Sequence, residues 1–162
     1  MATLSIVVCG APLASVAVSL VRAAERLGFD VSLVATESSR GWLDEGAQAL
    51  VVPAPRRPEA VLVCPLTFNT GNKWAAGVSD NSQLGLLNES LGTVARVVAV
   101  PFVNESLWRH PAWANSLATL ANSGVMFVDP STGDAEARPT RHGTGDEVTA
   151  AFRPEWALDL LA

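Results

Sequence analysis

The sequence predicts an α/β protein with a flavodoxin-like or Rossmann-like three-layer fold, in which helices cover both faces of a five-stranded parallel sheet. Three observations lead to this prediction: short apolar runs, segments with helical periodicity between them, and a turn rich in small or polar residues after most runs. A strand covered on both faces is apolar throughout, because neither face meets water. With 162 residues, 49% of them apolar, the chain is long enough to bury a core, and we expect residues 1–162 to form one domain.

Two strand and helix pairs are expected in the first fifty residues. Leu4–Cys9 is a continuous apolar, β-branched run that predicts a strand, and Leu13–Leu27 follows it with helical spacing and stops at a glycine. Val31–Thr36 predicts the second strand. The Glu and Ser residues after it are suited to cap a short helix that runs to about Ala49.

The middle of the chain holds the third strand and two helical pieces. Val51–Pro58 contains three prolines and two arginines, which predicts a surface connection. Ala60–Cys64 is the third apolar run, and Pro65–Asn69 is the expected turn after it. Asn72–Val78 and Ser82–Leu91 then show helical spacing and are separated by turn residues.

The last third of the chain completes the alternation. Arg96–Val100 predicts the fourth strand, after which a proline starts a loop. A helix is expected from Pro111 or the next residue to about position 123, where a glycine follows, and Val125–Val128 is the fifth strand. Asp146–Leu161 predicts a final helix that is interrupted at Pro154.

Charge and cysteine content exclude several classes of protein. The chain has 11 Lys and Arg against 16 Asp and Glu, a net charge of -5, so we expect no nucleic-acid partner. Cys9 and Cys64 are too few for a disulfide scaffold or a metal site, and a reducing cytoplasm fits them best. Residues 1–21 carry no charge, but they lack a basic start and are broken near Gly10, so we expect neither a signal peptide nor a membrane partner.

The residues directly after the strands are the candidates for ligand binding. In an open parallel sheet, ligands bind beyond the carboxyl ends of the strands. The four turns concerned are rich in Gly, Ser, Thr and Asn; they are Gly10–Pro12, Thr36–Ser39, Pro65–Thr70 and Pro101–Asn104. A glycine at a helix start and hydroxyls from the neighbouring turn can hold a phosphate monoester. The first turn lacks both G-x-G-x-x-G and the P-loop lysine, which disfavours a dinucleotide or a nucleoside triphosphate.

Two segments resemble motifs of a known family. Cys64–Thr70 and the residues up to Asn81 resemble the P-A-S-A-N-T segment and the following G-x-A-D-N of the homo-oligomeric flavin-containing cysteine decarboxylases. Pro101–Trp108 matches the substrate motif P-x-M-N-x-x-M-W of that family, with Val and Leu in place of the two methionines. The family includes phosphopantothenoylcysteine decarboxylases and enzymes that act on the C-terminal cysteines of lantibiotic-type peptides. The resemblance runs from Leu4 to about Val128.

The resemblance implies an FMN-binding flavoprotein that assembles as a homotrimer or a multiple of it, with the flavin at a subunit interface. The cofactor-binding residues implied are Gly10, Ala11, Pro12, Thr36, Ser38, Ser39, Pro65, Thr67, Phe68, Asn69 and Thr70. For catalysis and substrate binding the candidates are Asn69, Asn104, Trp108 and His110. The substrate implied is a small molecule or a peptide end. In such enzymes FMN oxidises a cysteine thiol to a thioaldehyde, which loses carbon dioxide to give an enethiol.

Two departures from the family pattern leave the reaction open. The catalytic histidine of the family lies before the P-A-S-A-N-T turn, yet the first histidine here is His110, which is either a substitute base or an ordinary loop residue. His142 lies in Arg138–Gly145, where phosphopantothenoylcysteine decarboxylases carry a cysteine in a clamp over the substrate. The missing cysteine disfavours coenzyme A biosynthesis.

Three functions remain in view from the sequence. The first is FMN-dependent oxidative decarboxylation, or a related oxidation, of a thiol or carboxylate substrate. The second is an FMN-binding regulatory or assembly protein that has lost decarboxylase activity. A weaker third is a Rossmann-like domain that binds another phosphorylated ligand and no flavin.

Overall fold

The computed structural model describes residues 1–162 and contains one five-stranded, all-parallel sheet in the order β2-β1-β3-β4-β5. The strands are β1 Thr3–Val8, β2 Asp30–Ala35, β3 Ala60–Leu66, β4 Arg96–Pro101 and β5 Met126–Phe127. Strand β1 pairs with β2 from Thr3↔Asp30 to Val8↔Ala35, without a register shift. This order is that of the flavodoxin-like fold, and it confirms the predicted α/β architecture.

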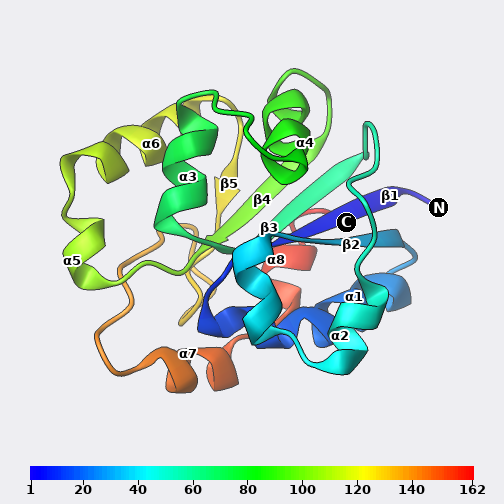
Figure 1. Cartoon of the computed structure of the whole chain (residues 1–162), viewed down its shortest axis with the longest axis horizontal. Helices are drawn as coiled ribbons and strands as arrows, with labels where there is room; N and C mark the ends of the chain where they lie inside the picture. Colours follow the sequence, from blue (N-terminus) through cyan, green and yellow to red (C-terminus); the bar gives the residue numbers. More distant parts are fainter.

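Helices connect the strands and cover both faces of the sheet (Figure 1). They comprise two 3₁₀ segments, η1 Pro12–Val16 and η2 Glu37–Trp42, and eight α-helices: α1 Ala17–Arg26, α2 Glu45–Leu50, α3 Phe68–Ala75, α4 Ser82–Leu91, α5 Glu105–Trp108, α6 Pro111–Asn122, α7 Gly145–Ala151 and α8 Glu155–Leu158. None of them combines the length and the apolar character that crossing a bilayer requires.

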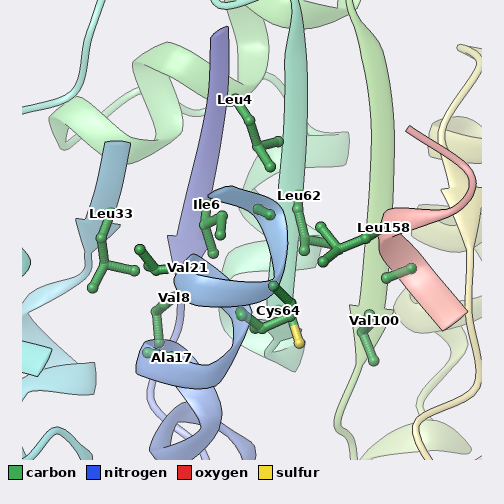
Figure 2. Packing of buried hydrophobic residues seen from close by; sticks show 14 of the residues in the cluster. Leu4, Ile6, Val8, Ala17, Val21, Leu33, Leu62, Cys64, Val100 and Leu158 are labelled. Carbon is green, nitrogen blue, oxygen red and sulfur yellow. The ribbon is translucent and has the colours of Figure 1, made fainter. Parts of the chain in front are cut away.

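The sheet separates two hydrophobic cores, because successive side chains of a strand point to opposite faces. On one face, side chains of β1 such as Ile6 and Val8 pack with those of α1 and α8, as Figure 2 shows. On the other face, Val7 of β1 packs with the buried residues of α3, α4 and α6. All seven residues of β3 are buried, which explains why this strand is apolar throughout.

The same alternation separates the two cysteines. Cys64 lies in the core beside α1 and α8 (Figure 2), whereas Cys9 lies in the core beside α3, so the two thiols face opposite layers. Both are free and buried, and burial raises the pKa of each thiol. Hydrogen bonds with Thr70 and Thr67 lower the pKa of Cys9 in part. The cysteines therefore behave as small buried hydrophobes and cannot pair with each other.

Several element boundaries differ from the sequence-based expectation. Strand β3 continues through Pro65 and Leu66, and α3 begins at Phe68, so the turn expected at Pro65–Asn69 is wrong. The carbonyl of Pro65 accepts a hydrogen bond from Cys9 N at 3.2 Å, which extends the pairing of β1 and β3 by one residue. A proline fits there because its carbonyl can still pair although it has no N–H group to donate.

Side-chain caps explain other differences. The loop expected after β4 contains the short helix α5, which Asn104 caps. The single short helix expected up to Ala49 is two pieces, η2 and α2, because the carboxylate of Asp44 accepts from Ala47 N at 2.7 Å and starts a new helix. The first helix begins as the 3₁₀ segment η1, and the last is interrupted at Pro154 as predicted.

Candidate functional site

A polar hollow of about 390 Å³ opens at the carboxyl ends of the strands, beside β2 and β3. None of its lining residues is apolar; they are Thr36, Glu37, Ser38, Asn69, Thr70 and Asn81. They come from the turn after β2, the first turn of α3 and the residue that precedes α4. These segments meet because the chain crosses from one side of β1 to the other, and this switch point is where open α/β sheets bind ligands.

The turn after β1 lies in direct contact with this hollow. A Cβ atom on Gly10 would lie 2.6 Å from the carbonyl oxygen and 2.8 Å from Oγ of Ser38, so only glycine lets the two turns approach this closely. The Gly10 N–H donates to no acceptor within the chain. Gly10 therefore brings a free main-chain donor to the hydroxyls of the second turn, as the sequence predicts.

The hydroxyl groups of the turn after β2 differ in whether they can bind a ligand. Oγ1 of Thr36 and Oγ of Ser38 lie 3.2 Å apart at the hollow, and either can donate to the other. Ser39 is fully buried, and its Oγ donates to the carbonyl of Thr36 at 2.7 Å. Thr36 and Ser38 can thus reach a ligand in the hollow, whereas the hydroxyl of Ser39 is held in an internal bond.

The start of α3 supplies an amide and a second group of donors. Thr67 caps the helix by accepting from Thr70 N at 3.4 Å. Asn69 is exposed in the first turn, and its side chain has no hydrogen-bond partner within the chain. The first N–H groups of a helix lack intrahelical partners, so this end of α3 favours an anion or a polar ring edge.

Helix α4 closes the hollow on its third side. Asn81 caps α4 by accepting from Leu84 N at 2.8 Å, which leaves its amide group available. Gln83 Nε2 donates to the carbonyl of Ala35 at 2.9 Å, which ties α4 to the end of β2. Asn81 was not among the predicted cofactor-binding residues, and Glu37 was included only as part of the turn Thr36–Ser39. The sequence could have indicated Asn81, because it is the last residue of the segment that resembles G-x-A-D-N.

Lys73 does not contribute a free charge to this site. Its Nζ lies 2.7 Å from a carboxylate oxygen of Asp80, and both side chains are partly exposed. This ion pair links Lys73 of α3 to Asp80 in the loop before α4. The charged group that lines the hollow is the carboxylate of Glu37.

The second motif forms a separate group of residues that does not line the hollow. Oδ1 of Asn104 caps α5 by accepting from Leu107 N at 2.9 Å, and its Nδ2 has no partner within the chain. Trp108 is half-buried, with its ring 5.8 Å from that of Trp113. His110 lies outside α5 and caps α6, because its Nδ1 accepts from Ala112 N at 3.1 Å.

An aromatic cluster joins this group to α3. Phe68, in the first turn of α3, lies 5.6 Å from the ring of His110 and 5.7 Å from that of Trp113. A Cβ atom on Gly71 would lie 2.6 Å from the Trp113 ring, so glycine is required where α6 crosses α3. Among the predicted cofactor residues, Phe68 therefore packs with the second motif. Pro65 lies within β3, and Thr67 caps α3.

The residues at the hollow fit a flavin mononucleotide. Hydroxyls of Thr36 and Ser38 and the N–H of Gly10 can donate to a phosphate without a lysine, since neutral donors also stabilise a dianion. The amides of Asn69 and Asn81 each offer a donor and an acceptor, which suits a ring edge that carries both.

Known proteins resemble this chain both in sequence and in fold. The family described as Flavoprotein matches residues 14–150. A cysteine/cysteine sulfinic acid decarboxylase from an unidentified prokaryote is 33% identical over 82 residues, which are 51% of this chain and 22% of the relative. The chain thus matches only about a fifth of that relative's length.

Solved structures share the fold at lower identity. A PPC decarboxylase mutant complexed with pantothenoylaminoethenethiol superposes with a TM-score of 0.68 at 20% identity, over 80% of this chain and 82% of that one. The FMN binding protein AtHal3 superposes with a TM-score of 0.69 at 16% identity, over 92% and 93% of the two chains. The sequence match spans most of the residues that build the sheet and the hollow. This chain is therefore a member of the Flavoprotein family, the family of the homo-oligomeric flavin-containing cysteine decarboxylases.

Proposed function

We propose that this protein binds FMN and catalyses a flavin-dependent oxidative decarboxylation, or a related oxidation, of a substrate that carries a thiol and a carboxylate. The observation that carries the proposal is the hollow itself. Hydroxyl and amide groups from three separate segments converge there, with the free N–H of Gly10 beside them, and none of the lining residues is apolar. A phosphate with a polar, hydrogen-bonding ring system fits such a donor set better than an apolar ligand does.

In this proposal the phosphate lies at Gly10, Thr36 and Ser38, and the ring edge lies at Asn69, Thr70 and Asn81. When bound, FMN supplies the two-electron oxidation of the thiol-bearing carbon. Asn104 then orients the substrate carboxylate through its free Nδ2 group, which remains a donor because Oδ1 is engaged as the cap of α5. Trp108 forms an apolar wall beside it.

We further propose that residues 1–162 act as one FMN-binding unit in a homotrimer or a multiple of it. The hollow has no hydrophobic side chain that could cover a flavin ring. A second copy can supply that surface from the side of the molecule that carries Phe68, Trp108 and the exposed Leu107. The net charge of -5 and the two free cysteines fit a cytoplasmic protein that acts on a small molecule or a peptide end.

Two measurements test the proposed function. The visible spectrum of the purified protein, before and after addition of FMN, reports flavin binding directly. Anaerobic incubation with cysteine-ending peptides then reports turnover, as bleaching of the flavin and as loss of carbon dioxide by mass. Protein that shows no flavin absorbance after incubation with FMN and removal of the unbound FMN would refute the proposal. Riboflavin serves as the matched ligand control, because it lacks the phosphate and should bind more weakly.

A second function is supported by one specific observation. No histidine precedes His110, and His110 itself uses Nδ1 to cap α6, so the chain lacks an upstream catalytic histidine. An FMN-binding regulatory or assembly protein without decarboxylase activity would have this composition. Tight FMN binding without bleaching by any thiol substrate would favour this second function over the first.

A further inference from the structure

Residues 129–144, which we call the strap, join β5 to α7 and cross the second motif. Asp129 fixes the start of the strap, although it is only 3% exposed. Its Oδ1 accepts from the N–H groups of Ser131 and Thr132 at 2.8 and 3.0 Å, and its Oδ2 accepts from Arg138 N at 2.9 Å. The path of the strap is thereby set before it reaches the motif.

The strap lies directly beside the proposed substrate-binding asparagine. Thr140 N donates to the carbonyl of Val103 at 2.8 Å, and Thr140 pairs with Asn104 in a parallel bridge. The side chain of Thr140 is buried, at 6% exposure, yet its Oγ1 has no hydrogen-bond partner. A buried hydroxyl without a partner is costly, and here it stands next to an amide whose Nδ2 is also free.

Two residues further along, His142 contacts the helix that follows Asn104. Its Nε2 lies 3.3 Å from Oγ of Ser106, and its main-chain N donates to Oε1 of Glu105 at 3.4 Å. If Nε2 carries the proton and donates to Ser106, Nδ1 keeps a lone pair and can accept a proton. Nδ1 has no partner within the chain.

The charged groups around His142 come from the strap and from α5. Glu105 is the acidic residue that contacts His142, and Arg109 Nη2 lies 4.0 Å from its second carboxylate oxygen. Arg138 and Arg141 are the exposed cations on the strap itself. The neighbourhood thus holds both signs of charge.

We propose that His142 carries the proton of the reaction proposed above, and that Ser106 is a positioning residue which holds its tautomer. The inference rests on the proposed function. Nδ1 accepts the thiol proton while the adjacent carbon is oxidised at the bound FMN, which leaves a carbon–sulfur double bond. When carbon dioxide leaves, the electron pair of the broken carbon–carbon bond moves onto sulfur. The proton on Nδ1 then returns to that sulfur and gives the enethiol.

This assignment gives the proton-carrying role to a histidine of the strap, since no histidine precedes His110 in this sequence. His110 is less suited, because its Nδ1 is already the cap of α6. His142 instead has one ring nitrogen in contact with Ser106, a second that is free, and an exposed position two residues beyond the bridge between Thr140 and Asn104. The buried Thr140 hydroxyl, which has no partner within the chain, adds a polar group to the strap next to Asn104.

The first experiment needs neither FMN nor turnover. In ¹⁵N-labelled full-length protein, long-range ¹H–¹⁵N spectra report which imidazole nitrogen carries the proton. We expect the Nε2–H tautomer for His142 in the wild type, and a mixture of tautomers in Ser106→Ala. The resonances are assigned by their loss in His142→Gln. An Nδ1–H tautomer in the wild type, or no change in Ser106→Ala, would overturn the positioning role.

The second experiment measures the rate of flavin bleaching by a thiol substrate against pH, in FMN-loaded protein under anaerobic conditions. We expect His142→Gln to bleach about 10²-fold more slowly near neutral pH and to lose the acid limb of the pH profile. Ser106→Ala should slow bleaching by about fivefold, as expected for one lost orienting hydrogen bond. Glu136→Gln, exposed on the same strap and without a contact to His142, is the matched control and should keep both rate and profile.

The outcomes separate this inference from the proposed function. Bleaching by the wild type together with an unchanged rate and pH profile in His142→Gln would overturn the role of His142 alone. A comparable loss in His110→Gln but not in His142→Gln would assign the proton to the other histidine, and would also overturn it. Failure of the wild type to bleach with any thiol would instead count against the proposed function, and the tautomer measurement would still decide the geometry.

Discussion

Asn104→Asp separates the two tasks that the structure assigns to Asn104. The oxygen Oδ1 caps α5 through Leu107 N at 2.9 Å, and Nδ2 is free to donate. Aspartate is about as good a cap as asparagine, so the substitution keeps the first task. It removes both N–H donors and places a negative charge where the proposed substrate carboxylate binds.

The expected magnitudes differ for stability and for turnover. A hydrogen bond to a charged group contributes about 1.5 to 3 kcal/mol, which corresponds to a loss of about 10- to 150-fold in the rate with substrate. Repulsion between two carboxylates adds to this loss. The free energy of unfolding should change by less than about 0.5 kcal/mol, because the cap remains and Asn104 is only half-buried. FMN retention should be unchanged, since Asn104 does not line the hollow.

Asn104→Ala is the matched control, because it removes both the cap and the donors. It should lose turnover to a similar degree and in addition lose about 0.5 to 1 kcal/mol of stability. The assays are anaerobic flavin bleaching, denaturant unfolding and FMN titration on all three proteins. If Asn104→Asp bleaches as fast as the wild type, the amide does not orient the substrate. If it is as unstable as Asn104→Ala, the division of tasks between Oδ1 and Nδ2 is wrong.

Three further predictions use other parts of the structure. Ser38→Ala should weaken FMN binding by about 1 to 2 kcal/mol in a titration. Ser39→Ala should mainly lower the free energy of unfolding, since the Ser39 hydroxyl is hydrogen-bonded within the turn. Equal effects of the two substitutions on FMN affinity would contradict this distinction. Gly71→Ala should destabilise the protein by about 1 to 3 kcal/mol, because the added Cβ would lie 2.6 Å from a tryptophan ring. Gly85→Ala, in the open middle of α4, should instead stabilise the protein by about 0.5 to 1 kcal/mol. Thermal melts of both variants show whether each change in stability has the expected sign. Burial raises the pKa of Cys64 and of the other buried thiol, so the free energy of unfolding should be constant below the ordinary thiol pKa of 9.0 and should fall as pH rises above it, where only the unfolded chain ionises. Denaturant titrations of Cys64→Ala at several pH values should show a smaller fall. An unchanged dependence of the unfolding free energy on pH would reject the explanation.

The fold could be read from the sequence because strand and helix formation depend mainly on local patterning. Ala60–Cys64 is apolar at every position, as is typical of a strand that helices cover on both faces. The turns that follow the parallel strands must then lie at one edge of the sheet, whatever the details of packing. That is why Thr36, Ser38, Asn69 and Thr70 could be grouped in advance, and they do line one hollow.

Which atoms face a ligand was decided only by contacts between residues far apart in the chain. Gln83 and Ala35 are 48 residues apart, and their hydrogen bond brings α4 and Asn81 to the hollow. The strap reaches Asn104 from 36 residues further along, at Thr140. Such contacts follow from register, from the path of loops and from close approaches such as that of Gly10 to Ser38. The sequence pattern predicts each helix or strand from its periodicity, but the distance between two elements is set only by how their surfaces pack together.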